Sequence, residues 1–142
     1  MTIKKNKFYI VFDCECLLCN NFLKFIDMRM SNKNSNIYVV SNLEFIQNEL
    51  IDKNKLDLLK QVQQKSIILI LPNKEFLLRS EAISYIFYLC NNKYLNLISK
   101  LIKLIPLTIS NFFYDLIAKY RKIFNNSISC DIYKPKNLIY IN

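Results

Sequence analysis

The sequence predicts a single α/β domain, and three observations support this fold class. Short apolar runs that suit buried strands alternate along the chain with longer stretches whose apolar residues recur at helical spacing. The chain has 142 residues, which is long enough to bury one hydrophobic core. Apolar residues make up 52% of it, which argues against disorder. We therefore expect a central sheet of about four strands, flanked by helices, with an extra helical segment at the C-terminal end.

Several short runs carry the pattern of strands. The run FYIVF at residues 8–12 contains no charge and suits a strand that is buried on both faces. The run SIILIL at residues 66–71 is the strongest strand pattern, and the turn that follows it predicts a hairpin with residues 75–79. A further strand is expected at residues 37–40, and the irregular end of the chain allows a short strand at 138–141.

Helical spacing begins directly after Cys16, where the apolar residues from Cys19 to Met30 share one face of a helix. Further helices are expected at residues 43–50, 56–62, from 80 onward, 93–105 and 107–124. We assign residues 1–142 to one domain, with its core at about 8–90, a helical tail at 93–124 and an irregular end at 125–142.

The composition limits the classes of function. The chain contains no Gly, His or Trp, a bias that is typical of AT-rich codons and that leaves Asn to form turns with positive φ. The net charge is +9 but comes mostly from Lys, and the aromatic residues lack interleaved Arg, so we predict no nucleic-acid partner. No apolar run has the length of a signal peptide core or of a transmembrane helix. This predicts a cytoplasmic protein, or one in the interior of an organelle or symbiont.

The segment DCECLLC, residues 13–19, places a Cys-x-x-Cys pair where a strand passes into a helix. The free N–H groups and the positive dipole end of the helix stabilise a thiolate at Cys16. We expect Cys16 to be the exposed nucleophile and Cys19 the buried resolving thiol. Because Asp13 and Glu15 are negative and the motif contains no Lys or Arg, we expect Cys16 to be only moderately acidic, as in a reductant. Asp13 either relays a proton to the resolving thiol or caps the helix.

Other interpretations of the cysteines stay open. Cys14, Cys16 and Cys19 offer three thiolates to zinc or another soft metal, although a second Cys-x-x-Cys is missing. A free cysteine is also a common core residue, which is our expectation for Cys90, whereas Cys130 near the irregular end is a spare thiol. In a reducing compartment, the five cysteines are not expected to form a structural disulfide framework.

The C-terminal region is both apolar and basic, with eight basic and two acidic residues from Asn91 onward. This composition allows the helices at 93–124 to contact an anionic membrane surface. We favour the interpretation that their apolar faces cover the strands, because a domain of this size needs helices over its sheet.

Three separated blocks of the sequence resemble one family. VFDCECLLCNNFLKFI is similar to the opening of the DCC family of thiol-disulfide oxidoreductases, named for an Asp-x-x-Cys-x-x-Cys motif that Asp13, Cys16 and Cys19 carry here. LLRSEAISYIFYL, residues 77–89, resembles the Arg-Ser-acidic-Ala helix start of that family. LIPLTISNFFYDLIAKYRKIF, residues 104–124, resembles its closing segment.

The resemblance extends from about residue 8 to residue 130 and implies a thioredoxin-like fold. It also implies reduction or exchange of disulfides through Cys16 and Cys19. The partners that follow are a protein or small-molecule disulfide substrate and a thiol reductant, with neither a cofactor nor a bound metal. Two departures bear on this activity. Cys14 stands where the family has Gly, and the proline that thioredoxins place before the third strand is missing at Lys65 and Ser66.

The resemblance also selects residues that would support the site or bind substrate. Arg79, Ser80 and Arg121 fall in the family blocks, and arginine is scarce in this chain. We expect both arginines to make bidentate contacts, which a lysine side chain cannot form. The alternatives are a helix cap for Ser80 and a surface ion pair between Arg79 and Glu81.

Overall fold

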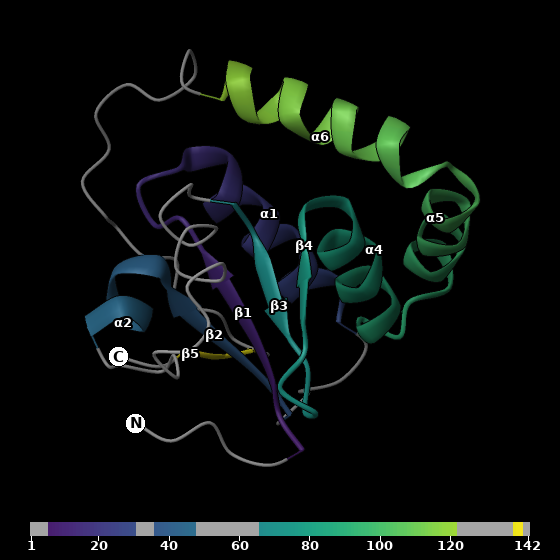
Figure 1. Ribbon diagram of the computed structural model, residues 1–142. Helices are drawn as coiled ribbons and strands as arrows, with labels where there is room; N and C mark the ends of the chain where they lie inside the picture. Colours follow the sequence, from purple (N-terminus) through teal and green to yellow (C-terminus); the bar gives the residue numbers. More distant parts are fainter. Residues whose placement is uncertain (1–5, 31–35, 48–65, 122–137, 141–142) are drawn as a thin grey trace.

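The computed structural model describes residues 6–30, 36–47, 66–121 and 138–140 (Figure 1). The expected helix at 56–62 and the residue Cys130 lie outside this part of the chain, and the assignment of residues 1–142 to one domain stays a prediction. The strands are β1 (Phe8–Phe12), β2 (Ile37–Ser41), β3 (Ile68–Ile70), β4 (Phe76–Leu78) and β5 (Ile139–Tyr140). The helices are α1 (Leu17–Arg29), α2 (Asn42–Gln47), α4 (Arg79–Leu89), α5 (Lys93–Leu104) and α6 (Leu107–Tyr120).

The five strands form one mixed sheet in the order β4-β3-β1-β2-β5. β2 lies parallel to both β1 and β5, and β3 lies antiparallel to both β1 and β4. The predicted α/β class is therefore confirmed, and the sheet contains one strand more than the four expected, because the short run near the C-terminus pairs with β2. Since β1 occupies the centre of the sheet, the loop after it emerges from the middle of the domain.

Alternation along the strands divides the core into two layers. Ile10 and Phe12 of β1 face one side of the sheet, together with buried residues of α1 and α4 such as Ile26 and Ile86. Tyr9 and neighbouring residues of the opposite face pack with α2 in a smaller cluster. A strand with both faces buried needs an apolar residue at every position, which explains the uncharged run FYIVF.

The short helix α2 begins with a reciprocal pair of side-chain contacts. The Ser41 Oγ accepts from the Glu44 backbone N–H at 3.2 Å, and the Glu44 carboxylate accepts from the Ser41 backbone N–H at 3.3 Å. This is a capping box, and it satisfies donors that a helix start leaves free. The Tyr140 hydroxyl donates to the same carboxylate at 2.6 Å, so the cap of α2 also holds β5 at the sheet edge.

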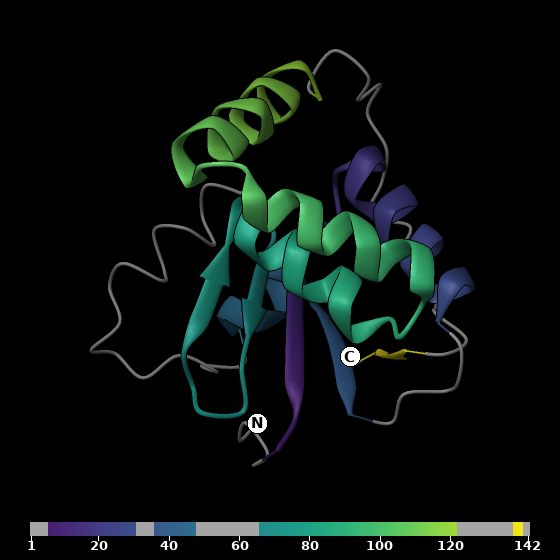
Figure 2. The ribbon, with the colours of Figure 1, turned by 90° about the vertical axis from the view of Figure 1, so that its right-hand side faces the viewer.

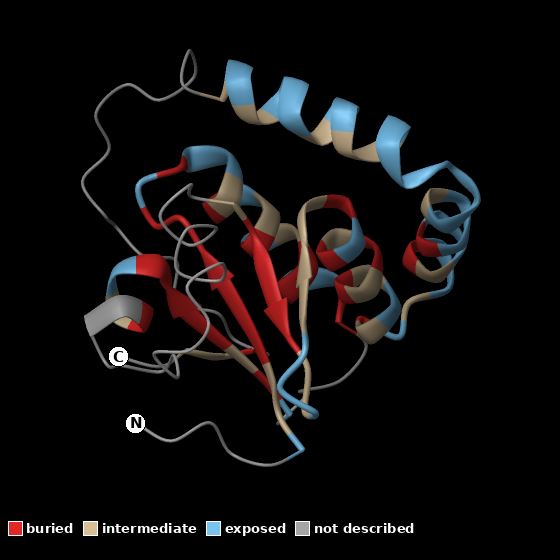
Figure 3. Cartoon of the chain, viewed as in Figure 1, coloured by how far each residue is buried: buried red, intermediate tan, exposed pale blue. Residues whose placement is uncertain are grey.

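The C-terminal helices are arranged differently from the expectation. α5 and α6 pack chiefly against α4, so that α5 forms a layer outside α4 and does not lie directly on the strands (Figure 2). α5 approaches α4 closely where the buried Ser84 hydroxyl donates to the Ser99 carbonyl at 3.1 Å. α6 crosses the end of the domain, and none of its residues is buried (Figure 3). Among the described residues, no single helix is long and apolar enough to cross a membrane.

Turns with positive φ are made without glycine. Asn6 and Asn91 adopt φ values of 64° and 51°, as expected for the residue that tolerates this conformation best after glycine. Lys74, in the β3–β4 turn, and Arg79, where β4 passes into α4, also have positive φ. Arginine carries a steric cost in this region, so contacts of its side chain must hold it there.

Candidate active site

The turn between β1 and α1 is organised by Asp13. Its backbone carbonyl accepts from the Cys16 backbone N–H at 3.2 Å, and its Oδ1 accepts from the Glu15 backbone N–H at 3.2 Å. The carboxylate therefore closes the turn and does not cap α1, so the capping alternative for Asp13 is wrong. Its side chain is buried, at 3% exposure.

The residue that caps α1 is Cys16 itself. Its extended backbone precedes the first helical residue, and its Sγ accepts from the Cys19 backbone N–H at 3.4 Å. An N-cap normally uses the oxygen of Ser, Thr, Asp or Asn, so a sulfur in this position replaces that acceptor. Behind the cap, the Asn20 amide donates to the Cys14 carbonyl at 3.0 Å and fixes the loop to the first turn of α1.

The surroundings of Cys16 favour the thiolate. The pKa of this thiol is lowered from 9.0 to about 6, first by the hydrogen bond that the Cys19 side chain donates, and further by the Cys19 backbone N–H and the charge of Arg121. Burial and the charge of Asp13 act in the opposite direction. Cys16 is thus more acidic than its negative neighbours led us to expect.

Cys19 behaves as the protonated partner. Its pKa is raised well above 9.0, first because its side chain donates to Cys16, and also by burial and by the Cys16 charge. Cys16 is buried at 1% exposure, so the expected exposure of the nucleophile is not observed, whereas Cys19 is half-buried and burial acts on its thiol. The reason is the capping role, which folds Cys16 Sγ back over the helix end.

The far end of the chain contributes two groups to this site. Arg121, which follows α6, lowers the pKa of both thiols through its charge, and this supports the prediction that it assists the site. Tyr114 on α6 was not predicted. Its hydroxyl accepts from the Ile67 backbone N–H at 3.0 Å, and its pKa is raised first by burial and also by the charge of Cys19. The signal that could have identified Tyr114 is its place in the closing family block.

Arg79 and Ser80 lie elsewhere, where they fasten α6 to α4. The Arg79 Nη1 atom pairs with Asp115 Oδ2 at 3.2 Å, so the partner is not Glu81 and the expected bidentate contact is not formed. The Ser80 Oγ donates to Asn111 Oδ1 at 2.6 Å. The predicted cap at Ser80 is also wrong, because α4 begins at Arg79 without a side-chain cap.

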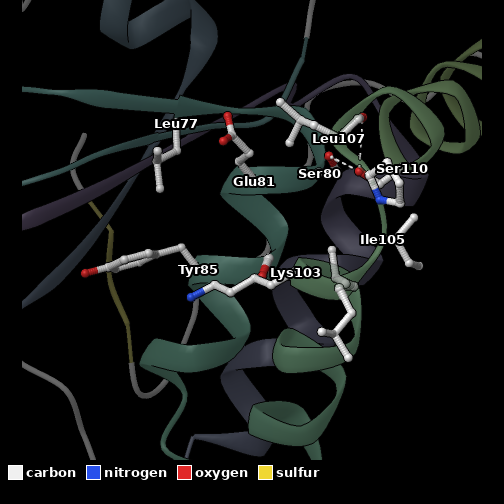
Figure 4. Close-up of a pocket in the computed structure, with 12 residues that line it drawn as sticks. Leu77, Ser80, Glu81, Tyr85, Lys103, Ile105, Leu107 and Ser110 are labelled. Carbon is white, nitrogen blue, oxygen red and sulfur yellow. Dashed lines mark hydrogen bonds between the residues drawn. The ribbon is translucent and has the colours of Figure 1, made fainter.

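One cavity near these contacts does not include the cysteines. It has a volume of about 470 Å³ and lies where α5 turns into α6 over α4 (Figure 4). Ser80 and Ser110 lie at one end of it, and Tyr85 and Lys103 lie at the other. Ser80 therefore belongs to the junction of the helices and not to the surroundings of Cys16.

The other cysteines decide between the open interpretations. Cys14 is disulfide-bonded, contrary to the expectation of a free thiol, so it does not offer a thiolate to a metal. Within the described ranges, no group of three or more metal-ligating residues is found, which disfavours the zinc alternative. Cys90 is a free, buried thiol whose pKa is raised to about 11 by burial, which fits the expected core role.

The mixed sheet, the flanking helices and a free Cys-x-x-Cys at the start of α1 together define a thioredoxin-like domain with a paired dithiol. The chain belongs to the DCC1-like thiol-disulfide oxidoreductase family, whose model matches residues 10–126. The resemblance noted in the sequence is therefore confirmed. No curated protein and no solved structure matches the chain.

Proposed function

We propose that the protein reduces or exchanges disulfides through Cys16 as nucleophile and Cys19 as resolving thiol. The single observation that carries this proposal is the state of the pair, in which Cys16 Sγ caps α1 and accepts hydrogen bonds from Cys19. With a pKa of about 6, Cys16 is largely ionised at neutral pH, and the thiolate is the attacking species in disulfide exchange.

In the first step, the Cys16 thiolate attacks one sulfur of a substrate disulfide. A mixed disulfide forms between Cys16 and that sulfur, while the other substrate sulfur leaves with the bonding electron pair and takes a proton from solvent. Because Cys16 is buried, the start of α1 must become accessible before a substrate of any size reaches its Sγ.

The second step follows from the causes of the Cys19 pKa. Two of them, the hydrogen bond to Cys16 and the Cys16 charge, depend on the Cys16 thiolate. The mixed disulfide removes that thiolate, so the pKa of Cys19 falls at the moment when Cys19 is needed. Cys19 then loses its proton and attacks Cys16 Sγ. The second substrate thiol leaves, and a Cys16–Cys19 disulfide remains, so two electrons have passed to the substrate.

Asp13 is the proposed acceptor of the Cys19 proton. Its charge raises the pKa of both thiols, which is the effect of a carboxylate held close to the pair. Arg121 has the complementary role, since its charge favours both thiolates. A protein or small-molecule disulfide is the substrate of this cycle, and a thiol reductant restores the dithiol.

The test is alkylation and mass mapping of the protein across a glutathione redox series, combined with a disulfide-reduction assay. We expect a reversible Cys16–Cys19 disulfide, loss of turnover in Cys16→Ser, and an accumulated mixed disulfide in Cys19→Ser. Cys90→Ser is the matched control, because Cys90 is also a free thiol but lies in the core, and it should retain turnover. Unchanged turnover in Cys16→Ser, or a pair that never oxidises, would refute the proposal.

A further inference from the structure

The helix α6 has its apolar side turned away from the domain. At about 100° per residue, six of its seven exposed large apolar residues fill a continuous arc of about 140°, and Leu107 lies outside it. These residues are exposed, and Phe112 and Phe113 reach 64% and 57%. The members of this outward arc are Ile109, Phe112, Phe113, Leu116, Ile117 and Tyr120.

The opposite side of α6, which faces the domain, is mostly polar or small, apart from Leu107 and Tyr114. Ser110 Oγ lies 3.0 Å from the Ser80 Oγ, and the Tyr114 hydroxyl binds a backbone N–H beside β3. The ion pair of Asp115 with Arg79 completes this attachment. A helix of a water-exposed domain normally buries its apolar side. In α6, polar contacts hold the helix to the domain, and the apolar side is left uncovered.

The helix α5 carries a second exposed apolar arc. Leu95 and Ser99 are buried on the side toward α4. A second apolar arc, about 120° wide, lies on the other side of the helix. Figure 3 shows exposed residues on the outer sides of both helices. The members of this second arc are Tyr94, Leu97, Ile98, Leu101, Leu104 and Ile105. We call the two arcs together the outer apolar face.

The charges beside the outer apolar face are almost all positive. Residues 93–121 contain five basic residues and one acidic residue. The acidic residue, Asp115, is already paired with Arg79. Lys93, Lys100 and Lys119 are exposed along the margins of the two arcs. A broad apolar arc bordered by lysines is the pattern of helices that lie in the interface of an anionic bilayer.

The length and the bend of the helix pair fit the same partner. Taken together, α5 and α6 have the length and composition of a membrane span, but they meet at an angle of 114°. Because of this bend the pair is not one straight span, and an exposed apolar arc on each helix is the property of helices that lie in a bilayer interface. The cavity at the bend is bordered by Ile105 and Leu107, so apolar side chains also line the entrance to this cavity (Figure 4).

We infer that the protein docks on anionic lipid bilayers through the outer apolar face of α5 and α6, with the flanking lysines contacting the lipid headgroups. This inference is independent of the disulfide chemistry, because none of its residues belongs to the cysteine pair.

The experiment is co-sedimentation of the full chain with vesicles. We expect binding to vesicles of phosphatidylcholine and phosphatidylserine in equal parts, and much weaker binding to phosphatidylcholine alone. Each lysine near such a surface increases the binding affinity about fivefold. The double substitution Lys93→Gln/Lys100→Gln should therefore weaken binding about twenty-five-fold. The matched control is Lys24→Gln, which should have no effect, because Lys24 is an exposed residue of α1 and not of α5 or α6.

A second variant tests the apolar part. Phe112→Ser/Phe113→Ser should weaken binding by more than about tenfold, because two aromatic rings no longer enter the interface. Its control is Met28→Ser, since Met28 is an apolar residue of α1 with 62% exposure. Circular dichroism should show an unchanged fold in each variant. Absence of vesicle binding, equal binding by the variants, or a dimer that the Phe substitutions dissociate would overturn the inference.

Discussion

The substitution Cys19→Ala should make Cys16 markedly less acidic. In the structure, Cys19 supplies the hydrogen bond that lowers the pKa of Cys16 most, and alanine removes that donor while it leaves the backbone N–H in place. Cys19→Ser is the matched variant, because its hydroxyl can donate in the same direction and should preserve most of the effect.

The expected change in the Cys16 pKa can be bounded from the interactions that set this pKa in the wild-type protein. The pKa of Cys16 falls from 9.0 to about 6, although burial and Asp13 oppose the change. Three influences lower it, so together they amount to more than about three pH units, or about 4 kcal/mol. The Cys19 side chain is the largest of the three and therefore supplies more than about one unit. The pKa in Cys19→Ala should exceed about 7.

The assay is the pH dependence of Cys16 alkylation by iodoacetamide, followed by peptide mass mapping. At pH 6 the wild-type thiol is about half ionised and the Cys19→Ala thiol is at most about one tenth ionised, so alkylation should slow at least about fivefold. A Cys19→Ala protein whose Cys16 still titrates near pH 6 would show that the side-chain hydrogen bond is not the main cause.

Other predictions concern different parts of the structure. In the wild-type protein, alkylation of Cys16 should rise with a midpoint near pH 6, whereas Cys90 should stay unreactive until its pKa of about 11; similar midpoints would contradict the assigned environments. Tyr114→Phe should lower the free energy of unfolding by about 1–3 kcal/mol, because a backbone N–H beside β3 loses its acceptor; urea denaturation measures this, and an unchanged midpoint would exclude the contact. Asp27→Ala should cost a similar amount, because the buried Asp27 carboxylate accepts from the Leu138 backbone N–H at 3.1 Å; hydrogen exchange at β5 should then accelerate, and unchanged protection there would count against this anchor.

The sequence allowed most strands to be predicted, because their signals are local. The runs at residues 8–12 and 37–40 were assigned almost to their observed ends, and the hairpin of β3 and β4 follows the predicted turn. The order of strands in the sheet was not accessible in this way. It depends on pairings between distant segments, such as that of β5 with β2, which no periodicity records.

The cysteine site was predicted in its residues but not in its environment. Cys16 and Cys19 could be found from their spacing at the start of a helix. The acidity of Cys16 could not, because the charge that assists it comes from Arg121, near the other end of the chain. The neighbours in sequence, Asp13 and Glu15, pointed to the opposite effect. A pKa depends on groups that are close in space, and the sequence lists only those that are close along the chain.

The helix α6 shows a second limit of sequence reasoning. Its apolar arc could be located from the spacing of residues such as Phe112 and Phe113, but an arc does not reveal which side faces the domain. That orientation is set by the Ser80–Asn111 hydrogen bond and the Arg79–Asp115 ion pair, which join two helices. We expected the apolar side of α6 to face the sheet, as in most helices that pack on a domain. This expectation is wrong.

The sulfur cap of α1 ties the redox equilibrium of the protein to the stability of its fold. The Cys16 thiolate stabilises the reduced folded state above the ordinary thiol pKa of 9.0, and this contribution is lost as the pH falls through about 6. Oxidation to a Cys16–Cys19 disulfide removes the negative cap, so the first turn of α1 keeps its N–H groups but loses its anionic acceptor. Whatever free energy the cap gives to the reduced form must also raise the reduction potential of the pair. The helix start therefore favours the dithiol, which makes the pair a milder reductant than an uncapped dithiol would be and makes its disulfide easy for a thiol reductant to reduce again.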